Sequence, residues 1–202
     1  DPGIAADLAS LGQPRTAVGL IVAALYARRD RGLPPFTTIS CDNLPGNGTL
    51  LREAVLELAE AHDRGLARWI GDYGAFPNSM VDRIVPATTV EAIEAHAARY
   101  GYRDDALVET ERFCQWVLES RFASDRPDLA SVGVTLAAVV APWEEAKLRL
   151  LNGAHSAIAY LGGLGGIEHV YEFVAAADRR ALIERLWDES AATLDPHSGI
   201  DL

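Results

Sequence analysis

The chain of 202 residues is 49% hydrophobic and 23% charged, and its 18 basic and 29 acidic side chains give a formal net charge of −11. It is long enough to bury a core, and its acidic balance argues against a nucleic-acid groove or an anionic membrane surface, since both need clustered Lys and Arg. No apolar run reaches the ~20 residues of a membrane span and no signal segment opens the chain, so we expect a cytoplasmic protein with a small-molecule partner.

Lysine and cysteine usage is more specific. Of the 18 basic residues 17 are arginine, and Lys147 is the only lysine. An amine can lose its proton in the working pH range and a guanidinium cannot, so Lys147 is a candidate for proton transfer. The two cysteines, Cys41 and Cys114, are too few for a disulfide framework and lack metal-ligand spacing. We expect both to be small buried hydrophobic residues.

The first part of the chain has the pattern of an α/β unit. It predicts a helix over 14–31, a short strand over 36–40, a Gly/Pro/Asn loop over 41–48 and an amphipathic helix over 49–70 with Thr49 as its N-cap. In such units ligands collect at the carboxyl ends of the strands. The loop after the predicted strand is therefore a candidate binding segment.

The middle of the chain is predicted to alternate further between strands and helices, and the last part to be helical. The patterns predict a loop and short strand over 75–86, a helix over 88–101 closed by Gly101, and a strand over 131–140. Residues 107–122 fit two short strands or a helix equally well. From Pro142 onward the patterns predict helices, over 142–166 and over 170–194, so the composition changes near residue 141 from mixed to all-helical.

One helical face combines polar groups with leucines. At ~100° per residue, Glu144, His155 and Asn152 lie about 60°, 80° and 140° from Lys147, and Leu148 and Leu151 lie on the same arc. This face is typical neither of a solvated helix, because of the leucines, nor of a core helix, because four buried polar groups would need partners. The structural alternative is an exposed Glu144–Lys147 pair, a helix that frays at Asn152 and a core histidine at His155.

The string KLRLLNGAHS, residues 147–156, resembles the catalytic signature of the polyol-specific long-chain dehydrogenases/reductases, the family of mannitol 2-dehydrogenases and fructuronate reductases. Further strings agree with this family in the same order: TTISCDNLPGNG, FPNSMVDRIVP, QWVLESRF and PWEEAKLRLLNGAHSAIAYLGGL. The resemblance extends over roughly residues 14–165. Several matches in sequence identify the chain as a member of this family.

The resemblance implies a fold and a division into domains. Residues 1–140 would be the later half of a Rossmann-type NAD(P)-binding domain, and residues 141–202 the beginning of an all-helical substrate domain, with the active site between them. Relatives begin with a glycine-rich dinucleotide fingerprint, and no GxGxxG turn precedes Asn43 here. Relatives also extend past Leu202, so we expect an internal fragment of a longer protein.

The activity that the resemblance implies is that of a metal-independent, NAD(P)-dependent oxidoreductase, with NAD favoured and NADP open. It would interconvert a sugar alcohol and its ketose. Mannitol and fructose are the favoured pair, mannonate and fructuronate the second, and arabinitol and sorbitol stay open. A noncatalytic polyol-binding fragment is a further alternative. A monomeric parent is compatible with the sequence, which does not otherwise reveal the oligomeric state.

The same resemblance assigns roles to individual residues. Lys147 would be the general acid/base, and Asn152 and Asn43 would donate hydrogen bonds to the reacting oxygen, as in an oxyanion hole. His155 would orient a substrate hydroxyl, Asp82 would line the site near cofactor and substrate, and Glu144 would connect Lys147 to solvent.

An unperturbed amine, with a pKa of ~10.4, is a poor base near neutral pH, and an apolar environment lowers this pKa. Leu148 and Leu151 are the candidates for that apolar wall.

Overall fold

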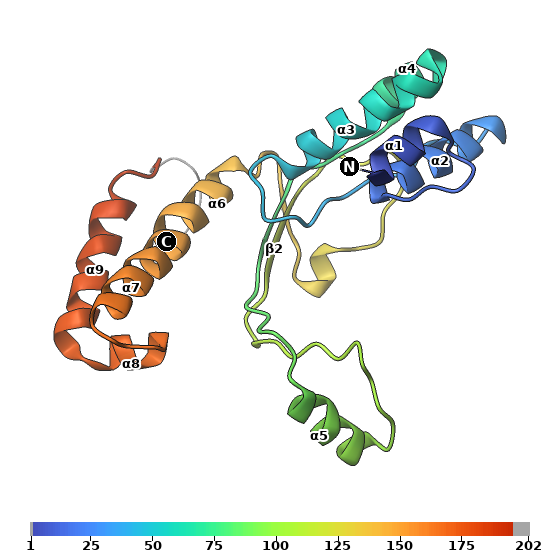
Figure 1. The fold of residues 1–202 in the computed structure, drawn as a ribbon. Coiled ribbons are helices and arrows are strands. Elements are labelled where there is room, and N and C mark those ends of the chain that lie inside the picture. The colour runs from blue at the N-terminus through green and yellow to red at the C-terminus, as the bar shows by residue number, and fades with distance from the viewer. Residues whose placement is uncertain (1, 196–202) are drawn as a thin grey trace. The chain divides into compact units, whose positions relative to one another are not determined.

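The computed structural model describes residues 2–195 (Figure 1). The chain divides into two compact units, Asp1–Ala137 and Ala138–Leu202. In the described residues the first unit combines helices with a sheet, and the second is helical. This confirms the predicted order of an α/β part followed by a helical part.

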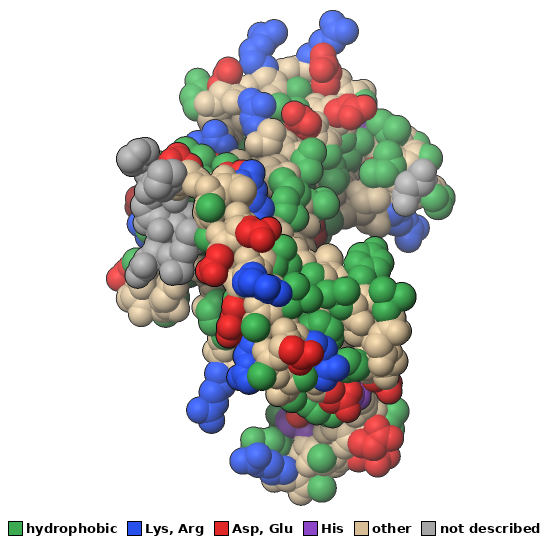
Figure 2. All heavy atoms as spheres, turned by 90° about the vertical axis from the view of Figure 1, so that its left-hand side faces the viewer, with side chains coloured by type: hydrophobic (Ala, Val, Ile, Leu, Met, Phe, Trp, Pro, Cys, Tyr) green, Lys and Arg blue, Asp and Glu red, His purple; other side chains and the backbone are tan. Residues whose placement is uncertain are grey.

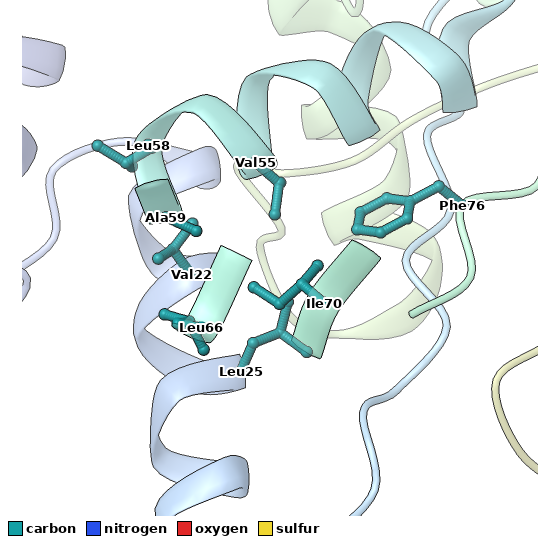
Figure 3. Close-up of a cluster of buried hydrophobic side chains, with 8 residues drawn as sticks. All are labelled: Val22, Leu25, Val55, Leu58, Ala59, Leu66, Ile70 and Phe76. Atoms are coloured by element: carbon teal, nitrogen blue, oxygen red, sulfur yellow. The ribbon is translucent and has the colours of Figure 1, made fainter. Parts of the chain in front are cut away.

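The helices of the first unit share one hydrophobic core. They are α1 (Pro2–Ala9), α2 (Ala17–Asp30), α3 (Asn47–His62) and α4 (Arg64–Tyr73). The core lies where α2, α3 and α4 meet (Figure 3), and its buried members are Val22, Leu25, Val55, Leu58, Ala59, Leu66, Ile70 and Phe76. Helix α2 was predicted from its periodicity, whereas α1 was not predicted.

Helix α1 is attached to α2 through a buried carboxylate. Asp7 is completely buried, and it accepts hydrogen bonds from the backbone N–H of Arg15 at 2.6 Å and from both the N–H and the hydroxyl of Thr16. Thr16 is also the N-cap of α2 and accepts from the Gly19 N–H at 3.0 Å. The positive end of the α2 dipole stabilises the negative charge of a carboxylate at this position.

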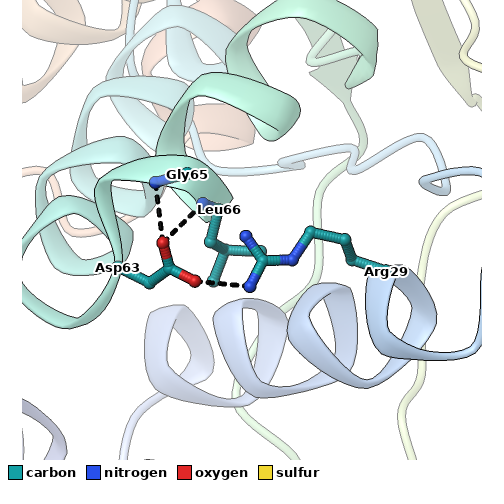
Figure 4. A network of polar contacts seen from close by, with 4 residues as sticks. All are labelled: Arg29, Asp63, Gly65 and Leu66. Carbon is teal, nitrogen blue, oxygen red and sulfur yellow. Dashed lines mark hydrogen bonds and ion pairs between the residues drawn. The ribbon is translucent and has the colours of Figure 1, made fainter.

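The prediction of one helix over 49–70 with Thr49 as N-cap is wrong at both points. Helix α3 begins at Asn47, after Gly46, which has a φ of +64°. The chain then breaks at Asp63, whose carboxylate accepts from the N–H groups of Gly65 and Leu66 at 2.7 and 3.1 Å and forms an ion pair with Arg29 at 2.5 Å (Figure 4). The side chain competes with the backbone for these donors and starts a new helix.

In the described residues the sheet has three strands in the order β1 (Ser79–Asp82), β2 (Gln115–Glu119) and β3 (Thr135–Ala137). Strands β1 and β2 are antiparallel, and β2 and β3 are parallel. Residues 107–122 thus contain one strand. The strand predicted over 131–140 is shorter than expected, because a 3₁₀ turn occupies Ala130–Val132.

The strand predicted over 36–40 is not formed as such. Only Thr37 pairs in this segment, through an isolated parallel bridge to Ala75. A strand needs neighbouring backbone groups along its whole length, and β-branched composition alone does not supply them. Within residues 2–195 only this one bridge is available to it.

A long excursion connects β1 to β2 and contains α5 (Val90–Tyr100). Thr89 caps this helix by accepting from the Ala92 N–H at 3.1 Å, and Gly101 ends it with a φ of +79°. Both ends match the predicted capped helix. None of the residues of α5 is buried in the described part of the chain, and Figure 1 shows the helix away from the sheet of its own unit.

The second unit contains α6 (Ala141–Ala146), the π-helix η2 (Lys147–Asn152), α7 (Gly153–Leu164), α8 (Val170–Ala175) and α9 (Ala177–Ala191). Its small core consists of Ala154, Ile158, Phe173 and Ile183. The helix predicted over 170–194 is interrupted at Ala176, which has an extended backbone with a ψ of 128°.

The surface includes hydrophobic residues and both cysteines. Figure 2 shows hydrophobic side chains mixed with acidic and basic ones on the face turned to the viewer. Cys41 and Cys114 are exposed, so the expectation that they are buried is wrong. They lie in a loop and just before β2, outside the packed faces of the helices. Within residues 2–195, no helix is both long enough and apolar enough to span a bilayer.

Candidate functional site

The segment that carries Lys147 and Asn152 is a π-helical turn between two α-helices. The N–H of Gly153 donates to the carbonyl of Leu148, five residues back, as well as to that of Leu150. Such turns are rare, occur mostly as single turns inside α-helices and are frequent at functional sites. The prediction of a uniform α-helix through this segment is therefore wrong.

The π turn changes how the polar groups are aligned. It accommodates one extra residue, so the residues after it lag by one α-helical step of about 100°. Relative to Lys147, Asn152 then lies at roughly 40° and His155 at roughly −20°, while Glu144, which precedes the turn, stays at roughly 60°. The four groups share an arc of about 80° instead of about 140°.

Burial in the second unit agrees with this shift. Ala146, Ala154 and Ile158 are all buried. With the shift they lie at about −100°, −120° and −80° from Lys147, which is one continuous stripe. In an unbroken α-helix, Ala154 and Ile158 would be about 80° and 120° away from Ala146. The turn therefore aligns the buried face and the polar face together.

The polar face lies beside this buried stripe. Glu144, Lys147 and Asn152 are half-buried and His155 is exposed. Leu148 is 56% exposed, because its position about 100° beyond Lys147 is on the side of the helix away from the buried stripe. The expectation that Leu148 supplies an apolar wall is wrong, and of the two leucines only Leu151 is half-buried.

The other two predicted site residues belong to the first unit. Asn43 is exposed in the loop 41–46, which precedes α3. Asp82 is the last residue of β1, is half-buried and lies opposite Gln115 in the register with β2. Within this unit, the loop and β1 are joined by a network of hydrogen bonds.

The centre of that network is Asn47, which is 2% exposed. Its amide nitrogen donates to the carbonyls of Asp42 and Ser79, both at 2.9 Å, and its amide oxygen accepts from the Ser79 N–H at 3.0 Å. The Ser79 hydroxyl in turn donates to the Ser40 carbonyl at 2.6 Å. Both ends of the segment that holds Asn43 are thus fixed to the start of β1.

Close backbone approach reinforces this arrangement. A Cβ at Gly48 would lie 2.3 Å from the carbonyl oxygen of Pro77, so only glycine fits there. Asn78, the next residue, accepts from the Thr49 N–H at 2.9 Å, and its own N–H donates to Glu119 at 3.0 Å. The glycine in the loop is explained by this packing.

Sequence reasoning missed Asn47. The string PGNG reads as an ordinary turn, in which asparagine is common for local reasons. A signal was available, because an asparagine just before an amphipathic helix can satisfy backbone groups of a neighbouring segment as well as its own. The sequence alone does not identify that neighbouring segment, since Ser79 is 32 residues away.

The structure thus places Glu144, Lys147, Asn152 and His155 along one helical segment of the second unit. It places Asn43 and Asp82 in two connected segments of the first. Among residues 2–195, no group of three or more His, Cys, Asp and Glu side chains is arranged to hold a metal ion.

Known proteins resemble all or most of the chain. The D-mannonate oxidoreductase of Escherichia coli (strain K12) is 45% identical over 203 residues, which cover 100% of this chain and 42% of that protein. The mannitol 2-dehydrogenase of Cereibacter sphaeroides is 49% identical over 174 residues, 86% of this chain and 36% of that protein.

A solved structure agrees with these relatives. The Pseudomonas fluorescens mannitol 2-dehydrogenase, in a ternary complex with NAD and D-mannitol, matches with a TM-score of 0.83 and 42% identity, over 100% of this chain and 41% of that chain. The chain therefore spans about two fifths of the length of these relatives.

Two family models account for nearly all of the chain. The model of the mannitol dehydrogenase Rossmann domain matches residues 8–131, and that of the mannitol dehydrogenase C-terminal domain matches residues 139–201. The resemblance noted in the sequence and the α/β-then-helical fold are confirmed by these matches. The chain belongs to the mannitol dehydrogenase family.

Proposed function

We propose that the full-length protein that carries this chain is an NAD(P)-dependent dehydrogenase of sugar alcohols or of the related sugar acids, with NAD as the favoured cofactor. The observation that carries the proposal is the alignment of Lys147, Asn152 and His155 by the π turn of a mannitol dehydrogenase family member. The names of the relatives, D-mannonate oxidoreductase and mannitol 2-dehydrogenase, support the same reaction class.

In this proposal Lys147 is the general acid/base. It takes the hydroxyl proton of the alcohol in oxidation and returns a proton to the carbonyl oxygen in reduction. The amides of Asn152 and Asn43 donate to that oxygen and stabilise its developing negative charge. Glu144, one turn before Lys147, connects the amine to solvent, and His155 orients a further hydroxyl of the substrate.

The first unit fits the binding of a cofactor beside the substrate. The loop 41–46 follows a segment in parallel pairing at Thr37, and the end of such a segment is where α/β folds bind ligands. Gly48 allows close approach to the Pro77 backbone. Asn43 in the loop and Asp82 at the end of β1 lie in the two segments that Asn47 connects, and both would line the site for cofactor and substrate. NAD, when bound, supplies or accepts the hydride.

We further propose that the domain boundary lies near residue 140, with the cofactor-binding part before it and the substrate-binding part after it. For the substrate we propose the mannitol and fructose pair. The 49% identity with a mannitol 2-dehydrogenase supports this pair. The mannonate and fructuronate pair is the second candidate, supported by the 45% identity with D-mannonate oxidoreductase.

The test is NADH oxidation by the full-length protein with fructose and with fructuronate, measured side by side. We expect turnover with at least one of them, and its loss in both Lys147→Ala and Lys147→Arg. The arginine variant is the matched control, because it keeps the positive charge and cannot exchange the proton.

Each other outcome has a definite meaning. Full activity of Lys147→Arg would show that the residue at this position does not transfer the proton. Binding of mannitol without binding of NADH would favour a noncatalytic polyol-binding protein.

A further inference from the structure

Two side chains connect the π turn to the end of α9. The indole Nε1–H of Trp187 donates to the carbonyl of Leu150 at 2.9 Å. Arg149 donates from Nη1 to the carbonyl and the hydroxyl of Thr193, at 2.6 and 2.7 Å, and also forms an ion pair with Glu145. Both connections begin inside η2, and they are made by residues 37 and 44 positions further along the chain.

The Leu150 carbonyl is unusual in its position. It lies inside the π turn and accepts from the backbone N–H of Gly153, three residues ahead, as well as from the indole. A carbonyl in a regular α-helix points along the axis to its partner four residues ahead, and side chains that enter this ladder are a recognised cause of helix distortion. The indole bond therefore favours the π form over the regular helix.

We propose that Trp187 is a positioning residue that holds η2 in its π form and so keeps Asn152 and His155 in line with Lys147. This inference rests on the proposed function, because it concerns the geometry of the same three groups. When the turn relaxes toward a regular α-helix, the residues after it rotate by up to about 100° and leave the common face.

The exposure of Trp187 distinguishes the positioning role from a packing role in the core of the second unit. Trp187 is 44% exposed, whereas Phe173 and Ile183, which form the nearby core, are each 2% exposed. Trp187 thus contributes less to packing than a core residue does. Its replacement by phenylalanine, which keeps an aromatic ring and removes only the indole donor, is expected to alter the turn more than the stability of the unit.

The test uses the full-length protein with NADH and with the better of fructose and fructuronate. For Trp187→Phe we expect kcat to fall by about 3- to 10-fold, the effect of one lost hydrogen bond, with the KM for NADH unchanged and the thermal midpoint lowered by less than in the control variant. The control is Trp69→Phe, which makes the same change at a half-buried position packed against the core of the first unit. It is expected to lower the thermal midpoint and leave kcat unchanged.

A second variant tests the mechanism directly. Deletion of Leu151 removes the extra residue, so Lys147, Asn152 and His155 are aligned by a regular α-helix with spacings of four and seven. In that background Trp187→Phe is expected to have no further effect on kcat. An equal loss in both backgrounds would overturn the proposal, because it would show that Trp187 acts other than through the turn.

The single variant decides the matter if the shortened chain does not fold. An unchanged kcat in Trp187→Phe overturns the proposal, and so does a loss of kcat that only parallels a loss of thermal stability. Lys147→Ala, measured in parallel, distinguishes a failure of the positioning role from a failure of the proposed chemistry. Its loss of activity together with an unaffected Trp187→Phe rejects the positioning role alone, whereas an active Lys147→Ala rejects the proposed chemistry.

Discussion

Asn47 and Ser79 hydrogen-bond to each other in both directions. The amide nitrogen of Asn47 donates to the Ser79 carbonyl at 2.9 Å, and the Ser79 N–H donates to the amide oxygen of Asn47 at 3.0 Å. A side-chain amide thus completes the backbone pairing at the start of β1. The pair fixes the loop that holds Asn43 against the strand that ends at Asp82.

Replacement of Asn47 by alanine is expected to lower the free energy of unfolding by about 2–4 kcal/mol, since it leaves a buried Ser79 N–H without its partner and removes the bonds to two carbonyls. Urea unfolding followed by circular dichroism measures this loss. The matched control is Asn43→Ala in the same loop. Asn43 is exposed, so we expect a loss of stability below about 1 kcal/mol, together with a lower kcat in the full-length protein. Equal destabilisation by both variants would contradict the central role of Asn47.

Gly48 tests the close approach of the loop. In Gly48→Ala the new Cβ meets the Pro77 carbonyl oxygen at 2.3 Å, and because both sides of the contact are backbone, we expect a loss of about 1–3 kcal/mol or more. Gly163→Ala is the opposite case, because among the described residues no atom other than those of its chain neighbours and of the nearby α7 backbone lies within 4 Å of a Cβ at this position. It is expected to raise stability by about 0.5–1 kcal/mol. Relative to the unmodified protein, the midpoint of thermal unfolding should therefore fall in Gly48→Ala and rise in Gly163→Ala.

The ion pair between Asp63 and Arg29 predicts acid sensitivity (Figure 4). The hydrogen bond from Arg29 is the main cause that lowers the pKa of Asp63, and those from Leu66 and Gly65 add to it, while burial opposes them. A carboxyl whose pKa is lower in the folded state stabilises the fold fully above its unfolded pKa, and this contribution disappears as the pH falls through the folded value.

The measurement is the free energy of unfolding of the unmodified chain and of Asp63→Asn across the acid range. Near neutral pH the unmodified protein should be the more stable of the two, and the difference should vanish once Asp63 is protonated. Asp7, whose pKa is lowered mainly by the Thr16 hydroxyl, titrates in both proteins and therefore cancels in the comparison. A difference independent of pH would show that the charge of Asp63 does not stabilise the fold.

Local patterns predicted those elements whose ends are determined by nearby residues. Helix α5 has both caps within its own segment, at Thr89 and Gly101, and its limits followed from the sequence. The segment around Thr37 has the composition of a strand, but whether it forms one depends on partners far along the chain. For the same reason the role of Asn47 could not be read from the sequence, because Ser79 lies in another element.

The candidate site could likewise be predicted only as far as nearby residues determine it. The residue types and their order in KLRLLNGAHS were enough to select Lys147, Asn152 and His155. Their arrangement was not predicted, because the angular arithmetic assumed a uniform α-helix. The turn that changes it involves Trp187, 37 residues from Leu150, and no local pattern encodes that contact.

The π turn also has a consequence for how the three groups can be spaced along a sequence. A helix that gains one residue can keep the packing on both sides of the insertion only by widening one turn, and η2 has this form. A Lys-x3-Asn-x2-His string on a regular α-helix would place the same three groups at about the same angles. A sequence search restricted to the spacing Lys-x4-Asn-x2-His would therefore overlook chains that carry the shorter string on a regular helix.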